Sequence, residues 1–192
     1  MESLAVKLIL GSQSPRRQEL LQREGFDLEL IAPDIDEVFP EGMSYFEVPE
    51  YLSVQKMNAV YAILNQDNDF ILCADTVVIF NDILLGKPDN LLHAFEILKA
   101  MNGNEHYVVT GVTIRKDNRL LSFSEKATVK FKVLSDAEIL NYIQTSNPLD
   151  KAGAYNIQDY PGFDKAIGAF ENVMGLPIKR VVEEVKNWDI VS

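Results

Sequence analysis

The chain has 192 residues, which is enough for one domain with a hydrophobic core of its own or for two small lobes that share one sheet. Hydrophobic residues make up 47% and charged residues 24%, as in water-soluble globular proteins, and no stretch is long and apolar enough to span a bilayer. The net charge of −11 disfavours nucleic acid polymers and anionic membranes as partners, and the single cysteine excludes an internal disulfide.

The first half of the chain has the pattern of strands that alternate with helices. Strands are expected at residues 7–10, 28–32 and 70–80, and helices at residues 16–24, 47–65 and 90–101. Ser14 and Pro15 are residue types favoured at the N-cap and first turn of a helix, and Gly25 is favoured at a helix end. An acidic loop is expected over residues 34–41.

In the second half of the chain the spacing of apolar residues changes. From residue 107 to residue 133 apolar positions recur every second residue, which predicts antiparallel strands joined near residues 117–118. Ser135 and Glu138 match a capping box that opens a helix to about residue 144, and a last helix is expected over residues 178–188. The long irregular segment 147–177 is typical of a functional loop. These elements together predict an α/β fold with a mixed sheet.

The segment between the first strand and the first helix combines groups that bind anions. Residues 11–17 read Gly-Ser-Gln-Ser-Pro-Arg-Arg, so hydroxyls of Ser12 and Ser14 and guanidiniums of Arg16 and Arg17 join the backbone N–H groups of a helix start. The spacing is not that of a Walker loop. Either this is a phosphate cradle, or it is a capped surface helix with solvated arginines.

Two acidic residues are candidates for metal binding or for activating water. Asp75, followed by Thr76, interrupts an apolar run in which a carboxylate is disfavoured, so either it serves a site or it caps a turn. Glu37 lies in the acidic loop and could complete a metal site with Asp75, with Lys56 on the following helix. The alternative for Glu37 is a solvated acidic loop.

Two further residues are candidates for contacts with a nucleotide. Lys87 follows Gly86 in a constrained turn from which its amine can reach a phosphate, although an exposed turn lysine is the simpler interpretation. The amide of Gln158 can donate and accept at a base edge, or its loop can simply pack on the sheet. His106 and Cys73 are interpreted as structural residues rather than as a metal ligand and a nucleophile.

Taken together, these motifs resemble the Maf (septum-formation-inhibitor) family of nucleotide pyrophosphatases. Residues 12–17 resemble the family signature Ser-x-Ser-Pro-Arg-Arg. Further blocks follow in the family's order along almost the whole chain: Asp36-Glu37, Lys56, Ala74-Asp75-Thr76-Val77-Val78, Leu85-Gly86-Lys87-Pro88, Thr110-Gly111-Val112, Asp150-Lys151-Ala152-Gly153-Ala154-Tyr155 and Gly175-Leu176-Pro177. Several blocks in one order are a much more specific signal than any block alone.

The resemblance implies a single domain over residues 1–192, with two lobes that share a mixed, highly curved sheet around a central cleft. It also implies that a nucleoside triphosphate is hydrolysed between its α- and β-phosphates to a monophosphate and pyrophosphate, with Mg²⁺ or Mn²⁺, by a homodimer. Residues 151–158 resemble the subgroup that acts on dTTP and UTP. Because the N-terminus has no recognisable signal peptide, a cytoplasmic enzyme is expected.

Our hypothesis for the site assigns a role to each motif. The catalytic residues are Asp75, Glu37 and Lys87, of which Asp75 and Glu37 also bind the metal. The substrate is bound through its phosphates and its nucleoside by Ser12, Ser14, Arg16, Arg17, Lys56, Thr76 and Gln158. No covalent nucleophile is required.

Three positions depart from the family pattern: Gln13 and Met57 stand where Ala is common, and Asp159 stands where Gly follows the Ile-Gln pair. Asp159 adds negative charge beside Gln158, which bears on substrate preference more than on catalysis. The alternatives are therefore the same hydrolysis of another noncanonical nucleotide, such as a modified pyrimidine nucleotide or 7-methyl-GTP, or a non-catalytic nucleotide-binding regulator of cell division.

Overall fold

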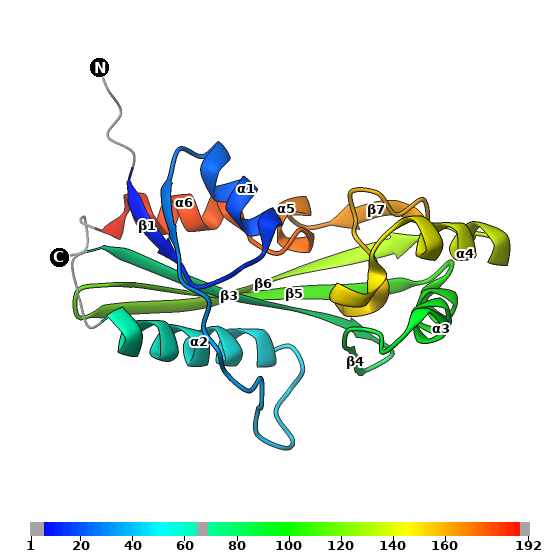
Figure 1. The fold of residues 1–192 in the computed structure, drawn as a ribbon, viewed down its shortest axis with the longest axis horizontal. Coiled ribbons are helices and arrows are strands. Elements are labelled where there is room, and N and C mark those ends of the chain that lie inside the picture. The colour runs from blue at the N-terminus through cyan, green and yellow to red at the C-terminus, as the bar shows by residue number, and fades with distance from the viewer. Residues whose placement is uncertain (1–5, 65–68, 189–192) are drawn as a thin grey trace. The chain divides into compact units, whose positions relative to one another are not determined.

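The computed structural model describes residues 6–64 and 69–188, which contain helices and a seven-stranded mixed sheet (Figure 1). The strands are β1 Lys7–Leu10, β2 Asp27–Leu30, β3 Phe70–Phe80, β4 Ile83–Leu85, β5 Glu105–Lys116, β6 Arg119–Phe131 and β7 Phe163–Ile167. The helices are α1 Pro15–Arg23, α2 Val48–Leu64, α3 Leu91–Met101, α4 Asp136–Thr145, α5 Phe170–Val173 and α6 Ile178–Lys186, with 3₁₀ turns η1 Pro148–Asp150 and η2 Ala152–Ala154.

The sheet combines parallel and antiparallel pairs, which confirms the predicted mixed α/β fold. Its strand order is β2-β1-β3-β5-β6-β7, with β4 paired to β3. β1 runs parallel to both β2 and β3, whereas β4 and β7 pair antiparallel with their neighbours. The parallel strands are joined through helices, since a parallel pair needs a long crossover connection.

The chain divides into two compact units, each with its own packing. Unit 1 comprises residues 1–75, 110–125 and 175–192, and unit 2 comprises residues 76–109 and 126–174. The three longest strands, β3, β5 and β6, contribute residues to both units. The assignment of residues 1–192 to a single domain stays a prediction.

In unit 1, α2 lies on one face of the strands and α1 and α6 lie on the other (Figure 1). Met57 and Val60 of α2 are fully buried and form a core cluster with three side chains of β1 and β3: Ile9, Ile71 and Cys73. Burial of these apolar side chains fixes which face of α2 meets the sheet. Met57, a departure from the family pattern, is therefore a core residue.

Capping residues and glycines in the sequence predict most helix ends correctly. The capping box at the start of α4 is present, because the Glu138 N–H donates to Ser135 Oγ and the Ser135 N–H donates to Glu138 Oε2. Gly25 adopts a φ of +86° just after α1, a conformation that disfavours residues with a side chain. Ser14 occupies the N-cap position of α1, as predicted, but its side chain makes no capping hydrogen bond.

The segment 147–177 is more ordered than the sequence indicated. It contains two 3₁₀ turns, the edge strand β7 and the short helix α5. β7 pairs antiparallel with β6, and the register of this pairing is irregular next to Phe131. The short sequence of β7 did not indicate a strand. The Gly and Pro content of the segment 147–177 had suggested irregular structure throughout.

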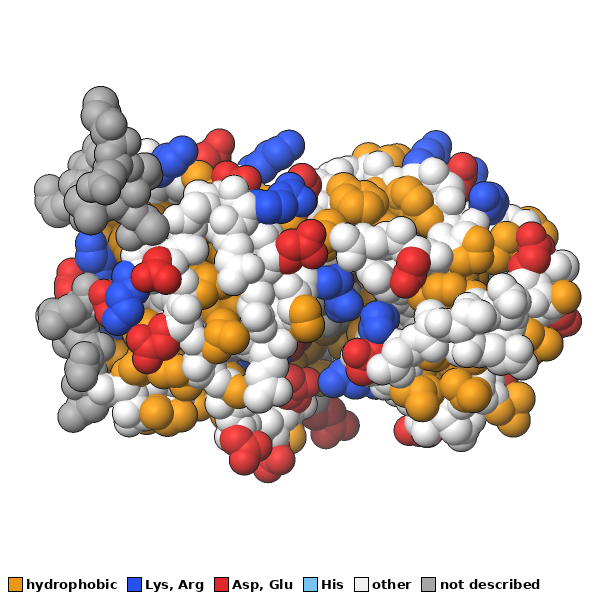
Figure 2. All heavy atoms as spheres, turned by 45° about the horizontal axis from the view of Figure 1, so that its top comes forward, with side chains coloured by type: hydrophobic (Ala, Val, Ile, Leu, Met, Phe, Trp, Pro, Cys, Tyr) orange, Lys and Arg blue, Asp and Glu red, His pale blue; other side chains and the backbone are white. Residues whose placement is uncertain are grey.

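On the face drawn in Figure 2, charged side chains are not separated by sign. Figure 2 shows acidic and basic side chains interspersed with hydrophobic ones on the face that it draws. That face therefore presents no extended basic field for a polyanion. Within the described part of the chain, no helix combines the length and apolar character that crossing a membrane requires.

Unit 2 has an aromatic core built around a buried histidine. His106 is 2% exposed, and its Nε2 lies 2.8 Å from the hydroxyl of Tyr155. Its ring packs edge-on against Phe131, and Tyr142 and Tyr160 extend the same cluster. Burial lowers the pKa of His106 to about 4, so the imidazole is neutral at physiological pH, as expected for a structural residue.

The buried histidine predicts a loss of stability in acid. Between pH about 6.5 and about 4 the unfolded chain protonates His106 and the folded protein does not, so the free energy of unfolding falls as pH decreases through this window. A shift of this size amounts to at most about 3 kcal/mol. Urea unfolding at several pH values should show a shallower pH dependence in His106→Gln than in the wild type.

A second histidine supplies the control. His93 lies on α3 and is only half-buried, so His93→Gln removes a histidine without disturbing the buried aromatic cluster. Equal slopes in His106→Gln and the wild type would contradict the assignment of this acid sensitivity to His106.

Candidate functional site

The loop after β1 is held against β3 by close backbone packing. The N–H of Gly11 donates to the carbonyl of Leu72 at 2.8 Å, which continues the pairing beyond the end of β1. A Cβ at Gly11 would overlap the Sγ of Cys73, so glycine is required where the chain leaves the sheet. The start of α1 and its arginines are thereby fixed relative to β3.

Ser12 organises the turn that leads into α1. Its Oγ accepts hydrogen bonds from the N–H of Ser14 at 3.2 Å and from Nη1 of Arg17 at 3.1 Å. Nε of Arg17 donates to the carbonyl of Gly175 at 2.8 Å, 158 residues along the chain. The guanidinium is therefore held in one orientation.

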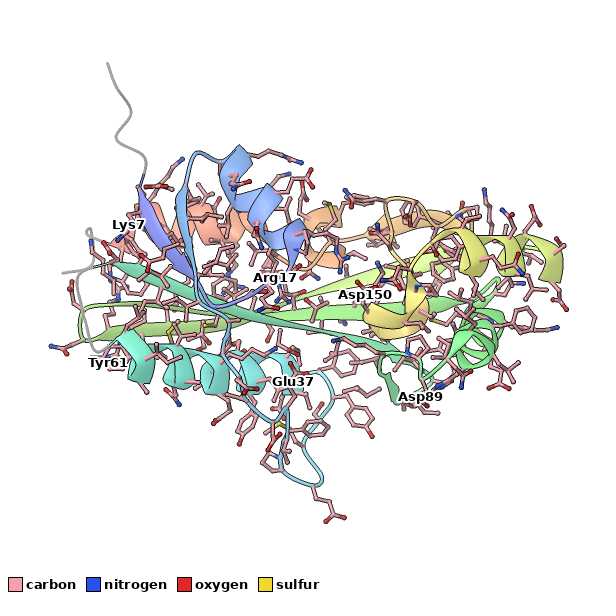
Figure 3. All side chains as sticks on the ribbon, viewed as in Figure 1. Lys7, Arg17, Glu37, Tyr61, Asp89 and Asp150 are labelled. Carbon is pink, nitrogen blue, oxygen red and sulfur yellow. The ribbon has the colours of Figure 1, made fainter. Side chains whose placement is uncertain are left out.

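A buried carboxylate lies next to this loop. Asp75 is 7% exposed within β3, and its Oδ1 lies 2.5 Å from Nζ of Lys56. The same ammonium lies 2.8 Å from Oε1 of Glu37, whose side chain is more than half exposed. Arg17 extends from the start of α1 and Glu37 from the loop that precedes α2 (Figure 3). The structure thus brings Ser12, Arg17, Glu37, Lys56 and Asp75 together in unit 1.

The electrostatics of this cluster are coupled. Burial raises the pKa of Asp75 above its ordinary value, and the positive charges of Lys56 and Arg17 counteract part of that rise. Burial lowers the pKa of Arg17, and the charge of Asp75 opposes this, although an arginine retains its proton in either case. A carboxylate with a raised pKa is a better proton acceptor than an ordinary aspartate.

The pairing of Lys56 with both acids was not anticipated. The sequence motif predicts that Lys56 binds the substrate, whereas the structure places its ammonium between Asp75 and Glu37. The Gly175 carbonyl was likewise not identified as the partner of Arg17. No local pattern signals contacts between residues so far apart in sequence.

The acids can hold a divalent cation only with other ligands. Among residues 6–64 and 69–188, no group of three or more His, Cys, Asp or Glu side chains is arranged to hold a metal ion. Asp75 and Glu37 nevertheless converge on one ammonium, and Mg²⁺ is commonly bound by one or two carboxylates together with water and substrate phosphates. Two carboxylates are therefore compatible with a divalent cation only if ligands from outside the protein complete its coordination.

Three of the predicted residues belong to unit 2. Thr76 follows Asp75 in β3, Lys87 is exposed in the loop between β4 and α3, and Gln158 is exposed in a turn before β7. Their relation to the cluster of unit 1 stays a prediction. Cys73 is buried and its pKa is raised to about 12 by burial, which supports its interpretation as a core residue.

In unit 2, the motif that contains Lys87 and the motif that contains Gly153 are joined by a backbone hydrogen bond. The N–H of Gly153 donates to the carbonyl of Gly86 at 3.1 Å, which ties the loop that carries Lys87 to the turn η2. Gly153 has a φ of +70°, and a Cβ at this position would lie 3.2 Å from the side chain of Val78 in β3. Asp159 is held by Tyr142, whose hydroxyl donates to Asp159 Oδ1 at 3.3 Å.

Removal of the Lys56 ammonium should show how much this charge contributes to the stability of a fold that buries the Asp75 carboxylate. Lys56→Met leaves Asp75 buried without its nearest positive charge, so we expect the free energy of unfolding to fall by about 3 kcal/mol at pH 7. The loss should shrink as pH decreases, because Asp75, with its raised pKa, then binds a proton in the folded state.

Lys7→Met is the matched control. Lys7 also lies between two acids, Asp69 and Glu29, but at an exposed site where such pairs contribute little. A loss in Lys56→Met as small as that in Lys7→Met would contradict the importance of the buried pair.

Comparisons with known proteins identify the family of this chain. A family model described as "Maf-like protein" matches residues 7–188. A "dTTP/UTP pyrophosphatase" from Bacteroides thetaiotaomicron is 39% identical over 184 residues, covering 94% of this chain and 95% of the relative. Proteins of the same name from Porphyromonas gingivalis and Thermosipho melanesiensis are 41% and 42% identical, and each alignment covers at least 94% of both chains. The chain therefore belongs to the family of Maf-like proteins.

Proposed function

We propose that this protein is a cytoplasmic nucleoside triphosphate pyrophosphatase that hydrolyses dTTP and UTP to a nucleoside monophosphate and pyrophosphate. The names of the full-length relatives support this activity and substrate. The observation that carries the proposal is the buried Asp75, paired with Lys56 and electrostatically coupled to Arg17 at the start of α1. This cluster combines a proton acceptor with positive charge for phosphates.

The phosphates are assigned to the segment that begins α1. Backbone N–H groups at a helix start and a nearby guanidinium favour a phosphate group. Arg17 is already oriented by Ser12 and Gly175, so it loses little side-chain entropy when it contacts an anion. We assign Arg16, which is partly exposed on the first turn of α1, to the same phosphates.

Asp75 is assigned to the attacking water. Its raised pKa favours proton acceptance, and its partner Lys56 stabilises the carboxylate before the reaction begins. A divalent cation held by Asp75 and Glu37 would neutralise phosphate charge and lower the pKa of a bound water. If these acids held such a cation, the ammonium of Lys56 would be available to the phosphates, which is the second role assigned to this residue.

The remaining assignments are also part of the proposal. Lys87 contacts the phosphates, and Thr76 and Gln158 contact the nucleoside. The protein functions as a homodimer, which light scattering coupled to size-exclusion chromatography would test by measuring the mass in solution.

A direct test measures pyrophosphate and phosphate release from a panel of nucleoside triphosphates with Mg²⁺ or Mn²⁺. We expect pyrophosphate, not phosphate, from dTTP and UTP. Asp75→Asn should lower kcat/KM by about 10²-fold or more, the usual contribution of a general base. Full activity of Asp75→Asn would remove Asp75 from the mechanism.

A second test concerns the phosphate contacts. Arg16→Ala should lower kcat/KM for UTP by about 10²-fold, because a preorganised charge that faces the reacting phosphates acts mainly in the transition state. Arg23→Ala removes an exposed arginine from the last turn of the same helix and should leave the kinetics unchanged. Equal effects of the two variants would contradict the assignment of Arg16.

One observation favours a different substrate for the same reaction. Asp159 places an exposed carboxylate beside Gln158, so a nucleotide with a base other than thymine or uracil is the second candidate. Modified pyrimidine nucleotides and 7-methyl-GTP belong in the panel for this reason. A higher kcat/KM for one of them than for UTP, reversed in Asp159→Gly, would favour it.

A further inference from the structure

The first turn of α2 lies directly on a glycine of β5. A Cβ at Gly111 would overlap backbone atoms of Pro49 and Glu50, so no other residue allows the helix to approach the strand so closely. Backbone atoms cannot move aside as the end of a flexible side chain can. Gly111 therefore sets how deeply the start of α2 sits on the sheet.

A chain of hydroxyl groups joins α2 to the strands one turn further on. Ser53 is fully buried, and its Oγ donates to the carbonyl of Glu50 at 2.7 Å. The same oxygen lies 2.7 Å from Oγ1 of Thr113, which is also fully buried and lies 3.0 Å from Oγ of Ser122.

The direction of these hydrogen bonds follows from the count of protons. Each hydroxyl has one proton, and that of Ser53 is used on the Glu50 carbonyl. Thr113 must therefore donate to Ser53, and Ser122 to Thr113. Because each member has one possible donor and acceptor pattern, the chain fixes the rotation of α2 as well as its depth.

Lys56 follows Ser53 by three residues, so both lie on the same side of the helix. The Lys56 side chain is 12% exposed and reaches two carboxylates at hydrogen-bond distance. A rotation or shift of α2 would carry the ammonium away from Asp75, since a lysine in so confined a space has few other rotamers. The position of the ammonium thus depends on how α2 is seated.

We propose that the Thr113 hydroxyl, acting through Ser53, is a positioning group that holds α2 where Lys56 meets Asp75 and Glu37. Its kinetic consequence rests on the proposed function, but its structural consequence does not. Thr113 acts through Ser53 and Lys56 rather than by contact with the reacting groups.

The structural consequence can be measured without any nucleotide. Competitive acetylation with acetic anhydride, read by mass spectrometry, reports how accessible each lysine amine is. Lys151 of unit 2 is the internal reference, since its side chain is 13% exposed and also paired with an acid. In Thr113→Val the labelling of Lys56 relative to Lys151 should rise about fivefold, the factor that corresponds to one hydrogen bond of ordinary net strength.

Two variants separate positioning from general destabilisation. Thr113→Ser retains the hydroxyl and should restore the wild-type ratio. Tyr155→Phe removes another buried hydroxyl, the one bonded to His106 in unit 2, so it should lower the melting temperature without raising the ratio. An unchanged ratio in Thr113→Val, or an equal rise in Tyr155→Phe, overturns the proposal. If Thr113→Val does not fold, Ser53→Ala removes the same Ser53–Thr113 hydrogen bond from the helix side. An unchanged labelling ratio in Ser53→Ala would then overturn the proposal.

The kinetic consequence is read from a double-mutant cycle. Introduced into the wild-type protein, Thr113→Val should lower kcat/KM for UTP about fivefold. Introduced into the Lys56→Met variant, it should lower kcat/KM by less than twofold, because its effect passes through Lys56. Equal losses in both backgrounds overturn the positioning role. Absence of pyrophosphate release from wild-type protein together with the expected labelling pattern would reject the proposed function and retain the positioning of Lys56.

Discussion

The ion pair between Asp75 and Lys56 is the constraint on which the rest of unit 1 depends. A carboxylate inside an apolar strand is stable only if a positive charge and hydrogen-bond donors compensate its lost hydration. Lys56 supplies that charge from a different element, so α2 must sit at a defined depth and rotation on the sheet. The glycine at position 111 and the buried hydroxyls beneath the helix serve that requirement.

Under the proposed function, a protein with a net charge of −11 binds a highly charged anion through a few local positive groups. These groups are held by neutral or acidic partners, rather than being part of an extended basic surface. Arg17 is oriented by a hydroxyl and a carbonyl, and Lys56 by two carboxylates. Local donors with fixed geometry are effective at short range, where the long-range field of the protein is screened.

Unit 2 is stabilised mainly by aromatic packing rather than by a buried ion pair. Its core is a cluster of aromatic rings around a neutral histidine, and the turn with Gln158 and Asp159 is attached to that cluster through the hydroxyl of Tyr142. Asp159, the clearest departure from the family pattern, is therefore accommodated by a hydrogen bond rather than left without a partner. This bond makes the turn a defined structure on which substrate preference can depend.

Much of the fold was determined by local sequence, because helix and strand periods, capping boxes and glycine turns act within a few residues. The order of strands and helices, the start of α4 and the unusual position of Asp75 within β3 were all predictable in this way. Three features were decided only by tertiary structure: the edge strand β7, the bond from Arg17 to Gly175, and the place of Lys56 between two acids. Each joins segments far apart in the chain, and only the packing of the folded protein determines which distant groups compensate one another.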